Sequence, residues 1–282
     1  MQSTYYLAYL TANDSPTFHV DYFNFLHMTR LDPGVDSIKV YVAVSLAKPW
    51  TTLDEQIITA IMNLANSCSW LNVKAVILKN NTGRDFSSAL KCLELISATA
   101  ADEDYIMVRS RSSRGPKHSS WYKKYIKQFH KFENTGLVGS TINLKDHKVR
   151  GNKSNVAHIQ TYIYLSQWKF VKELLLDFPA TNVTSHIDAI LHGEIELSQK
   201  IMSKGWRISS LQRPDLVVDA INQNEAIHQT GDVIVDLEAL PFIHKRKVKK
   251  KNSRLMEALR YSSILFYRLK KGGNWMLVKD LT

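Results

Sequence analysis

Short apolar runs rich in β-branched residues alternate with longer stretches of helical periodicity, and this alternation limits the possible folds more than any other feature. The first four runs cover residues 3–12, 37–46, 73–79 and 104–110. Between the second and third runs, apolar side chains recur at helical spacing from Leu53 to Leu64, after a suitable N-cap at Thr51 or Thr52. Strands that alternate with crossover helices predict an α/β protein with a mainly parallel, Rossmann-like sheet covered by helices on both faces.

The second half of the chain continues this alternation. We expect further strands over residues 135–142 and 158–165, and helices over residues 86–98, 121–132, 166–178 and 187–204. Ligands of such sheets bind outside the carboxyl ends of the strands, near the point where the strand order reverses. Polar residues that directly follow a predicted strand are therefore the first candidates for a site.

Positive charge is concentrated near the C-terminus. The formal net charge is +11, and residues 245–271 contain eleven Lys or Arg against one acid, Glu257, so this segment alone contributes +10. We therefore predict a main domain over residues 1–244 and a basic, amphipathic C-terminal segment over residues 245–282. Three interpretations of the segment remain open: contact with an anionic membrane surface, docking on its own domain, and, least expected without a recognisable motif, nucleic-acid binding.

The cysteines and the apolar runs indicate the compartment. Cys68 and Cys92 form neither a metal-binding spacing nor a disulfide framework, which is typical of a reducing compartment. The first residues lack the basic start and long apolar middle of a signal peptide, and every apolar run is shorter than the roughly 20 residues needed to span a bilayer. We expect a cytoplasmic protein, at most peripheral to a membrane.

Polar residues follow the third predicted strand in the stretch NNTGRDFSSAL, residues 80–90. Gly83 permits a tight turn, Asn81 offers donors and acceptors, Arg84 a planar donor fork, and Asp85 a carboxylate at a helix start. The same residues also fit a purely structural interpretation, in which Asp85 is an N-cap and Gly83 a turn former.

This stretch resembles the N-x-G-R-D segment of rhamnan synthesis protein F-like and related glycosyltransferases of the GT-A type. Four further segments resemble the same families in the same order: DYIMVRSRSSRGP from residue 104, HIQTYIYL from 158, GEIELSQKIMSKGWRI from 193 and, more weakly, LPFIHKRK from 240. The resemblance implies a GT-A-like fold and transfer of a hexosyl, deoxyhexosyl or pentosyl group from a nucleotide-sugar donor to a hydroxyl of a glycan or lipid-linked glycan. It also implies that Asn81, Gly83, Arg84 and Asp85 line the nucleoside side of the donor pocket.

The chain departs from the GT-A pattern after the fourth strand. Many GT-A enzymes carry two aspartates there to hold a divalent metal, whereas this chain has Ser110, Arg111 and, further on, Arg114. A hard cation requires carboxylate oxygens. We expect no metal cofactor, with Arg111 and Arg114 neutralising the diphosphate and His244, Lys245 and Arg246 assisting from the far side. A solvated basic loop with a disabled site is the alternative.

The remaining candidates concern the transfer step. Glu194 occupies the Glu position of the resembling segment and is the predicted base for the acceptor hydroxyl, with Glu196 and Asp188 in reserve. His158, Gln160 and Trp121 are candidate acceptor-binding residues, although a lone histidine on a strand and an aromatic on a helix are more often structural. A non-catalytic glycan- or nucleotide-binding module is the second function that the sequence allows.

Overall fold

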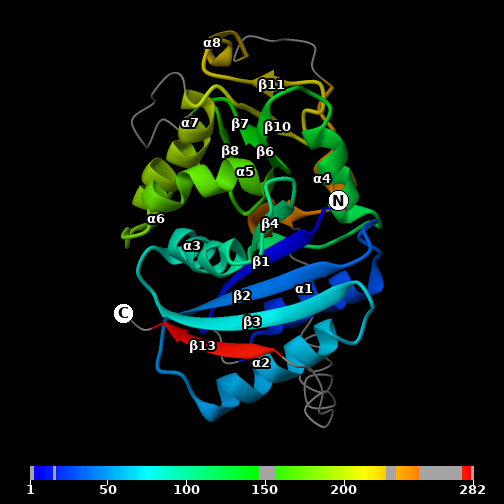
Figure 1. Cartoon of the computed structure of the whole chain (residues 1–282), viewed down its shortest axis with the longest axis vertical. Coiled ribbons are helices and arrows are strands. Elements are labelled where there is room, and N and C mark those ends of the chain that lie inside the picture. The colour runs from blue at the N-terminus through cyan, green and yellow to red at the C-terminus, as the bar shows by residue number, and fades with distance from the viewer. Residues whose placement is uncertain (1–2, 15–16, 146–155, 227–232, 248–274, 281–282) are drawn as a thin grey trace.

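A nine-stranded, mainly parallel sheet forms the centre of the computed structural model, which describes residues 3–14, 17–145, 156–226, 233–247 and 275–280. Figure 1 shows the sheet running through the molecule from β13 to β11. In the order of the sheet, the strands are β11 (Val217–Val218), β10 (Arg207–Ser210), β6 (Thr135–Gly139), β9 (Ile163–Gln167), β4 (Tyr105–Ser110), β1 (Tyr5–Ala12), β2 (Ile38–Leu46), β3 (Leu71–Asn80) and β13 (Met276–Asp280). The predicted α/β class with a mainly parallel sheet is confirmed.

The antiparallel pairings are confined to one half of the sheet. Strand β9 runs antiparallel to both β4 and β6, and β11 runs antiparallel to β10, whereas β1, β2, β3, β4 and β13 are mutually parallel. Two small ribbons lie outside the sheet and pair β5 (Ser113–Arg114) with β12 (Ile243–His244) and β7 (Ile142–Asn143) with β8 (His158–Ile159).

Helices cover both faces because successive side chains of a strand point in opposite directions. Leu7 and Tyr9 of β1 pack with α1, α2 and α4 on one face, whereas Tyr6, Ala8 and Leu10 pack with α3, α5 and α7 on the other. These helices are α1 (His19–Arg30), α2 (Thr52–Ala65), α3 (Arg84–Ser97), α4 (Trp121–Phe129), α5 (Trp168–Val171) and α7 (Glu196–Ser203). Shorter elements are the 3-10 turns η2 (Lys172–Asp177), η4 (Leu237–Ala239) and η5 (Lys245–Lys247), the π-helical turn η3 (Ile190–Ile195), α6 (His186–Ala189) and α8 (Gln223–Ala226).

Local signals explain some of these elements. Thr51 caps α2 as predicted, since its hydroxyl accepts from the Asp54 amide and the Asp54 carboxylate accepts from the Thr51 amide. The segment predicted as one strand over 158–165 is instead divided between β8 and β9, and Ser166, expected to open a helix, lies inside β9.

Part of the predicted C-terminal segment belongs to the main body. Met276–Asp280 forms β13 in register with residues 75–79 of β3. Residues 248–274 of the predicted basic, amphipathic segment lie outside the described residues, so contact of this segment with a membrane stays a prediction. Among the described residues, no helix has the length and apolar character to cross a bilayer.

Candidate functional site

A cavity of about 520 Å³ opens at the carboxyl edge of the parallel strands. Strand β1 lies between β2 and β4, so successive strands are added on either side of it and the strand order reverses there. The volume of the cavity lies within the range of roughly 300–1,000 Å³ typical of small-molecule sites. The lining residues used below are Thr11, Ala12, Asp14, Ser45, Asn81, Arg84, Asp85, Ser110, Arg111, Thr161, His186, Glu194, His244, Lys245 and Arg246.

The turn between β3 and α3 supplies one wall. Gly83 has φ of 72°, and a Cβ there would lie 2.0 Å from the carbonyl oxygen of Thr181, so only glycine fits. Its amide donates to Val183, and Arg84 Nη1 donates to the Thr184 carbonyl at 3.1 Å. Gly83 itself does not line the cavity. Its role in this structure is to let the turn pass close to residues 181–184, so that Asn81, Arg84 and Asp85 reach the cavity.

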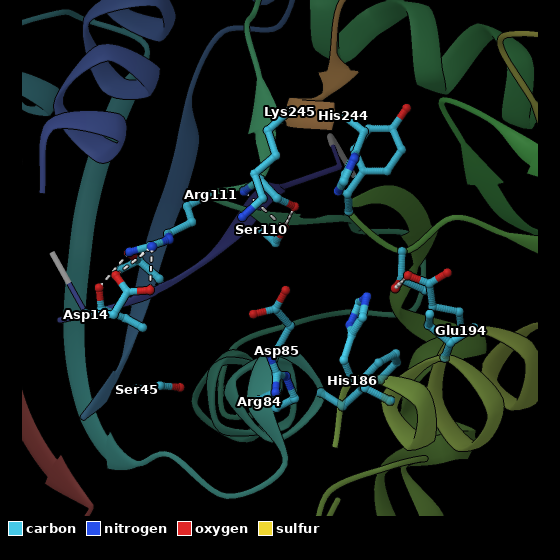
Figure 2. Close-up of a pocket in the computed structure, with 18 of the residues that line it drawn as sticks. Asp14, Ser45, Arg84, Asp85, Ser110, Arg111, His186, Glu194, His244 and Lys245 are labelled. Carbon is cyan, nitrogen blue, oxygen red and sulfur yellow. Dashed lines mark hydrogen bonds and ion pairs between the residues drawn. The ribbon is translucent and has the colours of Figure 1, made fainter. Parts of the chain in front are cut away.

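Asp85 occupies the middle of the cavity. Figure 2 shows its carboxylate pointing into the open space below Ser110 and Lys245. Asp85 is exposed to the open cavity, while the walls of the cavity partly enclose its carboxylate. This enclosure raises the pKa of Asp85, while the positive charges of Arg111, Arg84 and Lys245 oppose the rise.

Arg111 is held in place by several hydrogen bonds. Its amide donates to Leu10, its Nη1 donates to the Ala12 carbonyl at 2.8 Å, and its Nη2 lies 2.6 Å from Asp14 Oδ1 and 2.7 Å from Oδ2. Asn24 of α1 donates to the Arg111 carbonyl at 3.3 Å. The guanidinium therefore lies at the wall formed by the end of β1, with its direction set before any ligand binds.

The ribbon of β5 and β12 brings the C-terminal basic residues to the cavity. Ile243 pairs with Arg114 and His244 with Ser113, and the Lys245 amide donates to the Ser112 carbonyl at 2.8 Å. Residues 112–114 and 243–245, about 130 positions apart in the chain, are thereby brought together at one wall of the cavity. Arg114 lies in this ribbon and does not line the cavity, so the predicted pair of arginines is reduced to Arg111.

His244 is a neutral side chain at this wall. Its ring packs on Tyr162 with centroids 5.3 Å apart. Burial and the nearby charges of Arg246 and Lys245 lower the pKa of His244 to about 4. Arg246 Nη2 lies 3.2 Å from His186 Nε2, which connects this wall to α6. At neutral pH His244 therefore offers a hydrogen bond to a ligand without a charge.

Glu194 faces Asp85 from the opposite wall, as Figure 2 shows. It lies in the π-helical turn η3, a distortion frequently found at functional sites. Thr161 donates to Glu194 Oε1 at 3.2 Å. The reserve candidate Glu196 lies outside the cavity, with its carboxylate 3.2 Å from Lys200 Nζ, and Asp188 is also absent from the lining.

The three predicted acceptor-binding residues do not line the cavity. Trp121 is fully buried, donates through Nε1 to Leu31 and packs against Phe242, so its ring offers no face to a sugar. This placement corrects the predicted acceptor platform. His158 is also fully buried beside Asn143, and Gln160 accepts a hydrogen bond from Thr141 at 2.7 Å.

Several residues of the lining were not predicted from the sequence. Thr11 lies near the end of β1, Asp14 follows β1, Ser45 lies near the end of β2, and Thr161 and His186 lie on the Glu194 side. The rule that drew attention to residues 80–85 also applies to the polar residues at the ends of the first two strands. Thr161 and His186 carry no comparable signal, since neither follows a predicted parallel strand.

A divalent cation requires several oxygen ligands close together. Among the described residues, no group of three or more His, Cys, Asp or Glu is placed to hold a metal ion. The end of β4 presents Ser110 and Arg111, and Asp14 is engaged by that arginine. The described residues therefore do not fit a metal centre of the kind many GT-A enzymes carry.

Comparisons with known proteins give only distant structural similarity. No family model and no curated protein sequence matches the chain. A mannosyltransferase from Pyrobaculum calidifontis, solved with GDP-Man and Mn2+, is 11% identical at a TM-score of 0.47 over 74% of this chain. The galactosyltransferase LgtC, solved with donor and acceptor sugar analogs, is 12% identical at 0.38 over 67% of this chain and 69% of its own. A 4-diphosphocytidyl-2C-methyl-D-erythritol synthase is 15% identical at 0.38, over 80% of this chain and 98% of its own.

The chain spans little more than half of the mannosyltransferase, since the match covers 55% of that protein.

Proposed function

We propose that this protein is a glycosyltransferase that moves a sugar from a nucleotide-sugar donor to a hydroxyl of a glycan or lipid-linked glycan. The observation that carries the proposal is the cavity at the carboxyl edge of the sheet, which Arg84, Arg111, Lys245 and Arg246 line from three separate segments together with Glu194. A cluster of cations in one cavity with a carboxylate suits a ligand that carries a diphosphate at one end and a reacting hydroxyl at the other.

The donor would lie along the strand ends. Asn81, Arg84 and Asp85 would contact the nucleoside, whereas Arg111, Lys245 and Arg246 would contact the diphosphate. In the transfer step the acceptor oxygen bonds to the anomeric carbon and the bond from that carbon to the phosphate oxygen breaks. The acceptor proton passes to the Glu194 carboxylate. The nucleoside diphosphate leaves with the electron pair, and the fixed cations stabilise its developing charge without a metal.

Two measurements test this function. Nucleoside diphosphates and nucleotide sugars are screened for a rise in melting temperature with EDTA and with Mn²⁺, since a ligand that binds only the folded state must raise it. We expect one nucleotide to stabilise the protein in EDTA. A rise seen only with Mn²⁺ would contradict the metal-free step, and no rise with any nucleotide would contradict the function.

The catalytic assignment is tested by Glu194→Gln, with Glu196→Gln, two residues further along the chain, as the matched control. Loss of a general base typically lowers the rate by about 10²- to 10⁴-fold. We expect this loss in transfer for Glu194→Gln, with nucleotide binding retained, and no loss for Glu196→Gln. Binding with no transfer to any acceptor in the unaltered protein would favour the non-catalytic module.

A further inference from the structure

Lys79, at the carboxyl end of β3, carries a buried ammonium that the proposed reaction does not use. Only 3% of the residue is exposed. Its Nζ donates to Ser45 Oγ at 3.3 Å, to the Thr82 carbonyl at 3.0 Å and to the Asn80 carbonyl. An ammonium has three donors, so all three are used. None of the three acceptors is a carboxylate, which makes the site a cage of neutral oxygens around a cation.

Two of these acceptors belong to the turn that carries the candidate site. The carbonyls of Asn80 and Thr82 lie on the sheet side of the turn, while Asn81 and Arg84 line the cavity. Serine hydroxyls extend the same layer: Ser88 donates to the Arg84 carbonyl at 3.0 Å and lies 3.0 Å from Ser45 Oγ, and Ser87 donates to Thr82. The side of the turn facing the sheet is thus fixed from Lys79 to the first turn of α3.

We propose that Lys79 is a positioning residue, whose ammonium holds the turn of residues 80–83 in the shape that presents Asn81, Arg84 and Asp85 to the cavity. That the presented groups meet a nucleoside depends on the proposed function; that the ammonium shapes the turn does not. An apolar side chain at this place would remove the charged donor from both carbonyls and would leave Ser87 Oγ as the side-chain donor to Thr82. The turn would thus lose the charge-assisted hydrogen bonds that tie it to the sheet.

The charges around Lys79 come from two elements. Asp85 and Lys91 belong to α3, and Asp280 of β13 is the register partner of Lys79. Lys91 Nζ binds Asp280 Oδ2 at 2.8 Å. Burial lowers the pKa of Lys79 to about 8, and Lys91 adds to this effect, while Asp85 and Asp280 oppose it. The ammonium therefore loses its proton within an accessible pH range.

Deprotonation of Lys79 affects the order of the turn and the free energy of unfolding of the whole protein in opposite directions. Because the folded-state pKa lies below the ordinary value of 10.5, the unfolded chain binds the extra proton between about pH 8 and 10.5. The contribution of Lys79 to the free energy of unfolding therefore rises with pH over this range. The turn itself loosens, since a neutral amine has only two N–H donors for three acceptors. If Lys79 positions the turn, the turn becomes more mobile at high pH while the free energy of unfolding does not fall. A purely structural role would not separate these two effects.

The test compares Lys79→Met with Lys74→Met, a control on the same strand whose side chain is half-buried. Amide hydrogen exchange in the ligand-free protein follows the amides of Gly83, Phe86 and Ser87, which donate to Val183 and Gly83. We expect exchange of this turn to be about tenfold faster or more in Lys79→Met, as the loss of charge-assisted hydrogen bonds implies, and unchanged in Lys74→Met and in β1.

Binding of UDP, GDP, CDP and dTDP is measured on the same proteins. We expect the affinity of whichever diphosphate binds to fall about tenfold or more in Lys79→Met. If none binds the unaltered protein, the proposed function fails, while the exchange result still decides the role of Lys79. Unchanged exchange in a folded Lys79→Met would overturn the proposal. If that variant does not fold, the unaltered protein is compared at about pH 7 and 9.5 after correction for intrinsic exchange, and equal protection of the turn overturns it.

Discussion

Gly193 lies where the two walls of the cavity meet, and its replacement by alanine tests whether this contact sets the site. Gly193 precedes Glu194 in η3, and Phe86 follows Asp85 in α3. A Cβ on Gly193 would lie 2.3 Å from Phe86 Cε2 and 2.4 Å from Cζ, whereas carbon atoms in contact are about 3.5–4.0 Å apart. Phe86 is only 6% exposed, and its ring lines the cavity. The added methyl group must therefore push this ring into the cavity or separate the two elements, and either change alters the site.

The expected magnitude follows from two opposing effects. Alanine favours a helical backbone by about 1 kcal/mol over glycine, whereas overpacking a buried contact costs about 1–3 kcal/mol. We therefore expect Gly193→Ala to lower the free energy of unfolding by up to about 2 kcal/mol and to reduce sugar transfer, since the site is altered in either case. Shortening the opposing ring with Phe86→Leu should restore at least about 1 kcal/mol relative to the sum of the two single changes. Chemical denaturation of the four proteins measures this coupling, and additivity within about 0.5 kcal/mol would refute the reasoning.

Two further predictions concern charge at the cavity. The pKa of His244 is lowered to about 4, so the folded protein keeps the ring neutral while the unfolded chain takes up a proton below about pH 6.5. The free energy of unfolding should fall as the pH drops from about 6.5 to 4. The fall should be smaller in His244→Phe, which keeps an aromatic ring on Tyr162 but has no group that takes up a proton. Urea titrations of both proteins measure this, and equal losses would contradict the prediction. Arg111→Gln should weaken nucleoside diphosphate binding about tenfold or more and reduce its salt dependence, as measured by calorimetry at two salt concentrations. Arg207→Gln is the control, since Arg207 is half-buried, pairs with Asp219 and does not line the cavity. Equal affinity of the two variants would count against Arg111 as a phosphate ligand.

The sequence predicted the parallel half of the sheet well because its signals are local. Strands β1 to β4 are buried on both faces and appear as continuous apolar runs. Helix α1 was not predicted, because Asp21 and Asn24 lie on its buried face and disguise the apolar pattern. These two side chains form a buried polar group with Tyr9, at 2.9 Å for each hydrogen bond, which no periodicity analysis detects.

Candidate site residues were predicted correctly where their position at the end of one strand was enough to place them. They were missed where the cavity is formed by segments that are distant in the sequence. Asn81, Arg84 and Asp85 reach the cavity because the end of a parallel strand is by itself a topological position. Trp121 was interpreted from its residue type, although the helix that carries it turns this face into the core. Strand β13 could not be predicted, since its partner β3 lies about 200 residues earlier in the chain.

Arg109 holds in place the basic wall of the cavity, which consists of Arg111, Lys245 and Arg246. No local sequence pattern predicts this arrangement. The fully buried side chain of Arg109 donates through Nη2 to the carbonyls of Ser113 and Gly115, at 3.1 and 2.7 Å, and so fixes the loop after β4. Its guanidinium also lies 5.5 Å from the centre of the Tyr9 ring and 4.6 Å from that of Phe242. Phe242 leads directly into the residues that pair with β5, so one cation joins β1, the loop after β4 and the C-terminal segment. The position of the basic wall is therefore a property of the packed core, and it exists only once residues 9, 109 and 242 have come together.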